Sequence, residues 1–284
     1  PAKRNIGRPR LPVDRVFTMP GFGTIVTGTL VDGEVRLGQE LEIQPKGLRT
    51  RARGLQTHCH KVDVALPGSR VAVNLASLST TDVERGDVVT TPGWLRPTRV
   101  IDANIRLLPS APKELAHSVE VSFHVGSAET MAKVGLLDRD LLRPGERCWA
   151  QVRFAKPLAV AKGDLFVIRS PETTLGGGEI VDVHPKRHRR FQASVAKTLE
   201  LLQRGTPQEV VFQALHGPIP ADVKALVEKS GLPADQVKQA LSDLTERSEV
   251  IFLGEYAIST IGWEGLVGRV RDTVGAYHSQ FPLR

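Results

Sequence analysis

The sequence predicts a mixed fold in which two small β-barrel domains are followed by a winged helix-turn-helix domain. Three observations predict it. Short segments rich in Val, Ile, Leu and Thr, separated by glycines, fill residues 11–93. A second series of such segments fills residues 94–190, after a break at Pro92-Gly93. At Phe191 the spacing of apolar residues changes from two to about 3.6, the helical repeat, and this helical pattern predicts a domain over residues 191–262.

The first β domain is predicted from regularly spaced short strands with glycine turns, a pattern typical of small closed barrels. Asp32-Gly33 is a strong signal for a hairpin turn within it. The expected strands are residues 15–19, 24–31, 40–44, 70–76 and 87–91.

The second β domain is predicted from alternating apolar and polar residues over four segments, followed by a fifth. Three consecutive glycines, Gly176, Gly177 and Gly178, are expected to lead into that fifth strand. The expected strands are residues 99–108, 118–125, 148–154, 164–169 and 179–183, and a basic linker over residues 184–190 ends the domain.

The third domain is predicted from helix signals and a short ribbon. Phe191, Val195, Leu199 and Leu202 are expected to share one helical face, and Thr206–Glu209 has the form of a capping box with proline at the first helical position. The helix that follows is expected to close at Gly217. The remaining expectations are helices over residues 220–230, stopped by Gly231, and 233–248, then strands over 250–253 and 256–259. This order is typical of a winged helix-turn-helix, and residues 263–284 are expected to start a second one.

Composition excludes several classes of protein. Of the 284 residues, 40% are hydrophobic and 24% are charged, which argues against intrinsic disorder. With only Cys59 and Cys148, a disulfide framework is excluded and a reducing cytoplasm fits. No apolar run is long enough to span a membrane, and no signal peptide opens the chain. We therefore expect a cytoplasmic protein without a membrane partner.

The net charge of +7 is concentrated in two short segments. Residues 1–15 contain five basic residues and one acidic residue, and the basic linker 184–190 contains Lys186, Arg187, Arg189 and Arg190 with no acidic residue. Such clusters attract phosphate backbones. The alternative is that both are solvated linkers, with residues 1–10 connecting to a preceding domain.

No catalytic or metal-binding pattern is found, so no catalytic residue and no metal site are expected. The sequence has no phosphate-binding P-loop, and Gly21 and Gly23 precede a strand rather than a helix. In a strand, Cys59 would point away from His58 and His60, so an ordinary strand is favoured there over a metal site. Cys148 is expected to be a small core residue.

The charge of the helical domain argues against direct reading of nucleic acid. Between Thr206 and Thr260 the sequence has four basic and eight acidic residues. A module that docks on a polyanion is basic on the docking face. A spacer or protein-contact role is therefore favoured for this domain.

The β region resembles a known family. Residues 11–17 (LPVDRVF), 21–29 (GFGTIVTGT) and 33–38 (GEVRLG) resemble the opening of the second domain of translational GTPases such as elongation factor Tu. The region after Trp94 is similar to their third domain. The order of two barrels and winged helices, with VDRVF at 13–17 and GSRVAVN at 68–74, is similar to the bacterial selenocysteine-specific elongation factors. Residues 277–284 resemble the start of that family's second winged helix.

The resemblance implies parts outside this chain. A GTPase domain before Pro1 would hold GTP and magnesium, and further winged helices after Arg284 would bind the messenger RNA hairpin that directs selenocysteine insertion. This chain is then expected to be a non-catalytic monomer without a cofactor. It would bind selenocysteinyl-tRNA and act as a spacer in a factor that delivers that tRNA to the ribosome for UGA recoding.

The resemblance also assigns candidate site residues. Asp14, Arg15 and Arg70 match residues that line the selenocysteine pocket in the family, and Lys186, Arg187, Arg189 and Arg190 are candidate RNA-phosphate contacts. Without the resemblance, the first three would be a surface Asp–Arg pair and a strand-end arginine. The alternatives to this reading are a fragment of another translational GTPase, a transcription regulator with β domains and a winged helix, and an enzyme on a β-barrel scaffold.

Overall fold

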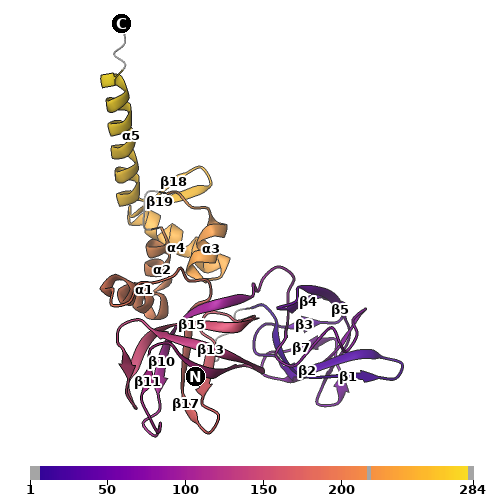
Figure 1. Ribbon diagram of the computed structural model, residues 1–284. Helices are drawn as coiled ribbons and strands as arrows, with labels where there is room; N and C mark the ends of the chain where they lie inside the picture. The colour runs from indigo at the N-terminus through magenta and orange to yellow at the C-terminus, as the bar shows by residue number, and fades with distance from the viewer. Residues whose placement is uncertain (1–6, 216–218, 281–284) are drawn as a thin grey trace. The chain divides into compact units, whose positions relative to one another are not determined.

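The computed structural model describes residues 7–215 and 219–280, and they form two compact units, Pro1–Ala193 and Ser194–Arg284 (Figure 1). The first unit holds two closed antiparallel barrels, and the second holds helices and a two-stranded ribbon. The predicted fold class is therefore confirmed for two barrels followed by helices.

The first barrel closes through six strands. Its order is β4 (Glu40–Gln44), β9 (Val88–Thr90), β1 (Arg10–Met19), β2 (Gly23–Thr29), β8 (Arg70–Leu75) and β5 (Leu48–Thr57), and β5 pairs with β4 to close the ring. A short β6 (His60–Lys61) extends β5, and β3 (Val35–Arg36) pairs separately with β7 (Val64–Ala65). Apolar residues that alternate along the strands, such as Leu11, Val26 and Val73, fill the interior and are fully buried.

The second barrel also closes through six strands. Its order is β10 (Thr98–Leu107), β15 (Arg147–Leu158), β13 (Ala128–Leu136), β12 (Val119–Val125), β16 (Leu165–Arg169) and β17 (Thr174–Asp182). A small pair, β11 (Leu115–Ala116) and β14 (Leu141–Leu142), lies beside it. Phe123 is fully buried in the core of this barrel. The centre of its ring lies 4.8 Å from that of Phe154 and 4.6 Å from that of Phe166.

Two turn predictions are wrong in physically informative ways. Asp32-Gly33 does not join a hairpin, because β2 and β3 do not pair. A β-carbon on Gly33 would meet the carbonyl carbon of Arg8 at 2.3 Å, so glycine is needed there for close packing. Gly176–Gly178 do not precede a strand but lie inside β17, where a β-carbon on Gly178 would lie 2.0 Å from the carbonyl oxygen of Asn104. These glycines allow neighbouring backbones to approach.

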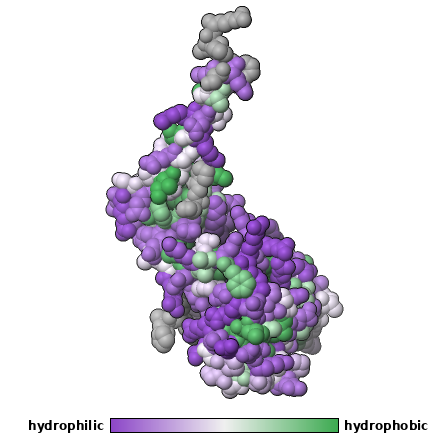
Figure 2. Space-filling view, turned by 60° about the vertical axis from the view of Figure 1, so that its left-hand side comes forward, coloured by the Kyte–Doolittle hydropathy of each residue, from purple (hydrophilic) through white to green (hydrophobic). Residues whose placement is uncertain are grey.

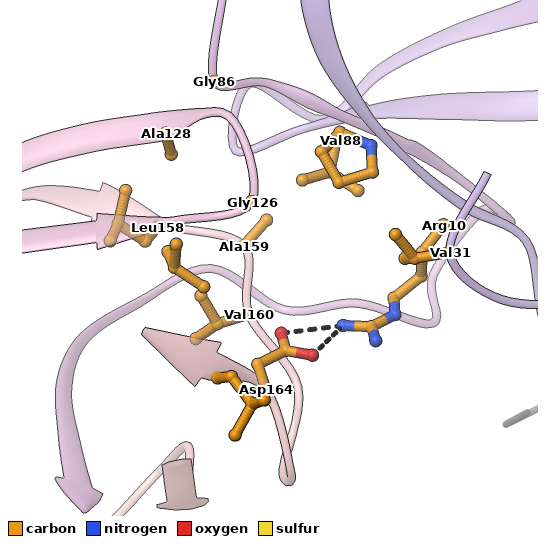
Figure 3. Close-up of a pocket in the computed structure, with 13 residues that line it drawn as sticks. Arg10, Val31, Gly86, Val88, Gly126, Ala128, Leu158, Ala159, Val160 and Asp164 are labelled. Carbon is orange, nitrogen blue, oxygen red and sulfur yellow. Dashed lines mark hydrogen bonds and ion pairs between the residues drawn. The ribbon is translucent and has the colours of Figure 1, made fainter. Parts of the chain in front are cut away.

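The two barrels meet at a joint centred on Arg10, which begins β1 and so does not belong to the predicted linker 1–10. Its guanidinium donates hydrogen bonds to Asp32 of the first barrel and to both carboxylate oxygens of Asp164 of the second, the latter at 2.7 Å. Figure 3 shows Arg10 and Asp164 at one side of a cavity that has mainly apolar walls. The volume of this cavity is about 210 Å³. Val88 and Ala161 pack together nearby, so both charge and apolar contacts hold the joint.

The second unit contains α1 (Ala193–Arg204), α2 (Pro207–Ala214), α3 (Val223–Ser230), α4 (Ala234–Glu246), β18 (Val250–Leu253), β19 (Tyr256–Ser259) and α5 (Thr260–Gln280). Thr206 and Glu209 form the predicted capping box, and Gly231 ends α3 in the left-handed conformation. Gly217 and residues 281–284 lie outside the described residues. The order of elements is the one expected for a winged helix, but the assignment of this unit as a winged helix stays a prediction. The assignment of residues 263–284 to the start of a second winged helix also stays a prediction.

On the face drawn in Figure 2, hydrophilic side chains predominate and hydrophobic ones gather in a few smaller areas. Helix α5 exposes Val270, Val274 and Tyr277. None of the described helices combines the length and the apolar character that crossing a membrane requires.

Candidate functional site

A bulge in β1 positions the candidate site. Val13 is opposite Gly28 of β2, but Arg15 is opposite Thr27, so Asp14 is an extra residue between two register positions. Such bulges redirect side chains and are over-represented next to functional sites. Asp14 and Arg15 are both turned away from the core, while Val13 is fully buried.

The carboxylate of Asp14 is held by two neighbouring strands. It accepts a hydrogen bond of 2.7 Å from the hydroxyl of Thr27 on β2. Arg70 at the start of β8 donates two more, from Nη1 at 2.7 Å and from Nη2 at 3.0 Å. A two-pronged contact of this kind fixes the guanidinium plane as well as its position.

The charges at the site follow from these contacts. Burial opposes ionisation of Asp14, but hydrogen bonds from Arg70 and Thr27 outweigh it and hold the pKa of Asp14 below its ordinary value. Asp14 is therefore a carboxylate at neutral pH, and Arg15 contributes to lowering its pKa. With two guanidiniums and one carboxylate, the cluster carries a net positive charge.

The structure brings together the three residues that the resemblance assigned. Asp14 and Arg70 are in direct contact, and Arg15 lies on the exposed side of β1 opposite Thr27. Thr27 was not anticipated. The alternation of buried and exposed residues in β2 could have placed Thr27 on the outer face, but not next to Asp14. More than half of the Arg70 side chain is exposed, and its contacts with Asp14 use only part of its donors, so the site can receive an anionic group.

The basic linker 184–190 is attached to the second barrel. The backbone carbonyl of Lys186 accepts a hydrogen bond from the side chain of Gln151, and His188 contacts the fully buried Asp102 at 2.5 Å. The hydrogen bond with Asp102 raises the pKa of His188, and burial opposes the rise. The side chains of Lys186, Arg187 and Arg189 are exposed.

Arg190 differs from the other three basic residues of the linker. Its guanidinium donates to the carbonyl oxygens of Leu136 and Arg139 and forms an ion pair with Asp140 at 2.6 Å. It also lies over the ring of Phe191, 4.5 Å from its centre. These contacts give Arg190 a role in fixing the end of the linker, and an RNA contact by it stays a prediction.

The segment around Cys59 is not the strand that the sequence predicted. His58 and Cys59 both have positive φ, and Thr57 pairs with His60, so the two residues form the tight turn between β5 and β6. Within the described part of the chain, no group of three or more His, Cys, Asp or Glu could hold a metal ion. Cys148 is buried in the second barrel, where burial raises its pKa to about 12.

Comparisons with known proteins identify both barrels. A family model described as elongation factor Tu domain 2 matches residues 23–90, and one described as the selenocysteine-specific elongation factor β-barrel domain matches residues 102–187.

Similar proteins extend the match over the helical unit. A selenocysteine-specific elongation factor of Desulfomicrobium baculatum is 39% identical over 97% of this chain and 44% of its own length. One of Haemophilus influenzae is 28% identical over 82% of this chain and 38% of its own length. Elongation factor Tu 2 of Streptomyces avermitilis is 28% identical over 61% of this chain and 45% of its own length.

The chain thus spans less than half the length of each of these relatives. The match to the relative from D. baculatum continues past the barrels and covers nearly all of this chain. The match to elongation factor Tu 2 covers only 61% of this chain. The barrel model matched over residues 102–187 is specific to the same group of factors. The chain therefore contains a barrel of the selenocysteine-specific elongation factor family and is similar to such a factor over nearly all of its own length.

Proposed function

We propose that this chain is the selenocysteinyl-tRNA-binding and spacer region of a factor that delivers that tRNA to the ribosome for UGA recoding. The observation that carries the proposal is the contact between Asp14 and Arg70, with Arg15 beside it on the outer face of the first barrel. We assign the aminoacyl group to this cluster. The barrels then hold the tRNA end, and the helical unit acts as a spacer.

The chemistry of the amino acid explains why such a cluster would discriminate. A selenol is largely ionised at neutral pH, whereas the hydroxyl of serine is not. A unit charge pair about 4 Å apart is worth about 4 kcal/mol at an effective dielectric constant of ~20. This corresponds to an upper limit near three decades of affinity, which desolvation reduces. The carboxylate of Asp14 reduces it further, because it already compensates part of the charge of Arg70.

The remaining roles follow from the same proposal. We assign no catalytic role to this chain and assign GTP and magnesium to a GTPase domain of the whole factor. We assign recognition of the messenger RNA hairpin to further winged helices of the whole factor. We propose that the factor acts as a monomer in the cytoplasm, and that Lys186, Arg187 and Arg189 contact RNA phosphates.

The test compares two tRNAs on the full-length factor. Arg70→Gln should lower the ratio of affinities for selenocysteinyl-tRNA and seryl-tRNA by about tenfold, which corresponds to about 1.4 kcal/mol. Arg36→Gln is the matched control, because Arg36 is an exposed arginine of the same barrel whose ion pair is with Glu34 and not with a residue of the site. An unchanged ratio in Arg70→Gln would overturn the assignment of the aminoacyl group. Tight binding of duplex DNA at physiological salt would favour a transcription regulator instead.

A further inference from the structure

A row of arginines lies along the outer face of β5. Arg49, Arg51 and Arg53, here called the arginine strip, are exposed, while Ala52 and Leu55 of the same strand are buried in the core. Residues two apart in a strand share one face, so the three guanidiniums start from the same side of the barrel. The basic charge of this face is not apparent from a count along the sequence, because it depends on β5 being a strand.

A second bulge contributes to the strip. Ala52 is opposite Leu75 of β8, and Gly54 is opposite Asn74, so Arg53 is the extra residue. Without it, a strictly alternating strand would place Gly54 on the inner face with Ala52. The bulge therefore lets Arg53 and Gly54 both lie outside the core, as the bulge in β1 does for Asp14 and Arg15.

The positive charge of the strip is only weakly compensated. Arg51 has one acidic neighbour, Glu40, at 3.7 Å, and both side chains are more than 60% exposed. Among the described residues, no carboxylate forms an ion pair with Arg49 or Arg53. Glu42, which is opposite Arg49, is buried and accepts a hydrogen bond from the backbone of Gly93 instead. Exposed pairs such as Arg51–Glu40 are weak and open readily to another anion.

The chemistry of the strip favours phosphate as its ligand. A guanidinium offers a planar fork of donors that fits phosphate oxygens. Successive arginines of the strip start about 6.6 Å apart along the strand, so each can meet a different phosphate of one backbone. A row of arginines without aromatic neighbours in the strand provides charge and position but no means of reading bases.

The position of the strip relates it to the proposed aminoacyl site. Strand β8 lies between β2 and β5, and Arg70 at its start belongs to that site. Arg53 lies beside Asn74, four residues further along β8, which is roughly 13 Å from Arg70 along the strand. Both features face outward from the same wall of the barrel. An RNA with its aminoacyl end at Asp14 and Arg70 therefore has part of its backbone within reach of the strip.

We propose that the arginine strip binds phosphates of the same tRNA whose aminoacyl group the Asp14–Arg70 site receives. The choice of tRNA rests on the proposed function, whereas the strip itself is a property of β5. Its contribution is salt-dependent and independent of the amino acid. The strip thus supplies affinity and register, and the Asp14–Arg70 site supplies discrimination.

The test is a salt titration of tRNA binding to the full-length factor. In the triple variant Arg49→Gln, Arg51→Gln, Arg53→Gln, the slope of log K against log salt should become shallower by about 2, since each neutralised phosphate contributes about 0.7. The ratio between selenocysteinyl-tRNA and seryl-tRNA should stay unchanged. Arg36→Gln, which removes one charge from the same barrel, should leave the slope unchanged. Arg53→Lys should also keep the wild-type salt slope, because lysine keeps the positive charge. This variant therefore distinguishes loss of charge from loss of folding.

The outcomes distinguish this proposal from the function on which it rests. If the folded triple variant has the same salt slope as the wild type, the arginine strip does not bind tRNA phosphates. This conclusion holds whatever Arg70→Gln does to the ratio of affinities for the two tRNAs. A shallower salt slope in the triple variant, together with an unchanged affinity ratio in Arg70→Gln, would support phosphate binding by the arginine strip. It would overturn the assignment of the aminoacyl group to the Asp14–Arg70 site. If the triple variant alters the salt dependence of ribosome binding but not of tRNA binding, the strip binds ribosomal RNA and the assignment to tRNA is wrong.

Discussion

Replacing Arg10 by methionine should destabilise the first unit strongly, because Arg10 forms ion pairs with one carboxylate of each barrel, Asp32 and Asp164. Its side chain is 10% exposed, and those of Asp32 and Asp164 are 2% and 17% exposed. Burial tends to lower the pKa of Arg10, but the two carboxylates outweigh it and raise the pKa, so the side chain stays charged. Methionine would keep the apolar part of the side chain and remove the ion pairs with Asp32 and Asp164, of which Figure 3 shows the one with Asp164.

The expected magnitude follows from this burial. Removing one partner of a buried ion pair costs about 3–5 kcal/mol, because the remaining charge is left uncompensated. Asp164→Asn should cost less, about 1–3 kcal/mol, since Arg10 keeps its contacts with Asp32 and Asp164 is nearer the surface. The control Arg36→Met breaks an exposed pair and should cost about 0–1 kcal/mol.

The assay is urea unfolding followed by the fluorescence of Trp94 and Trp149, which lie in the first unit, with Trp263→Phe removing the signal of the second. With a slope of about 1–3 kcal/mol per molar urea, a loss of 3 kcal/mol lowers the midpoint by about 1–3 M. If Arg10→Met lowers the free energy of unfolding by no more than Arg36→Met does, the reasoning is refuted. Such a result would mean that apolar contacts alone hold the joint.

Two further predictions concern the second barrel. The hydrogen bond with Asp102 raises the pKa of His188, so the stability from this contact is fully present below about pH 6.5 and is lost as the pH rises through the pKa of folded His188. Urea unfolding should show this loss in the wild type and not in His188→Gln, and identical pH profiles would contradict it. Gly178→Ala should destabilise the protein by about 1–3 kcal/mol, because the added carbon would lie 2.0 Å from a backbone oxygen. Gly265→Ala in α5, with no atom within 4 Å, should instead stabilise by up to about 1 kcal/mol in thermal unfolding, and equal effects would contradict the role of close packing.

The sequence predicts most strands of both barrels but misses β5 and β13. Strand β5 reads LRTRARGLQT, in which arginines and a glycine interrupt the apolar pattern. Strand β13 reads AETMAKVGL, in which Ala, Glu, Met and Lys are residues that favour helices. Both strands lie between two others in a closed ring, so pairing on both sides decides their conformation and overrides local preference.

The candidate site could be predicted only in part for a similar reason. Asp14 and Arg70 are 56 residues apart, and only the family resemblance brought them together at the sequence level. Thr27 was missed because its role depends on the register between β1 and β2. The turn at His58 and Cys59 was missed because the pair lacks the Asn-Gly, Asp-Gly or Gly-Gly sequence that ordinarily marks a two-residue hairpin turn.

The two bulges explain how charged residues share one wall of the barrel without entering its core. Strict alternation after the buried Val13 would place Asp14 outside and Arg15 inside, where an unpaired guanidinium is costly. Because Asp14 is an extra residue, Arg15 instead pairs with Thr27 on the outer face, and Val16 returns to the core side. Arg53 has the same role in β5, so that Leu55 remains buried. A barrel with the same residues but no bulges would have to bury a charge or expose its apolar side chains. The irregular register is therefore what allows the site and the strip to lie on one continuous outer face.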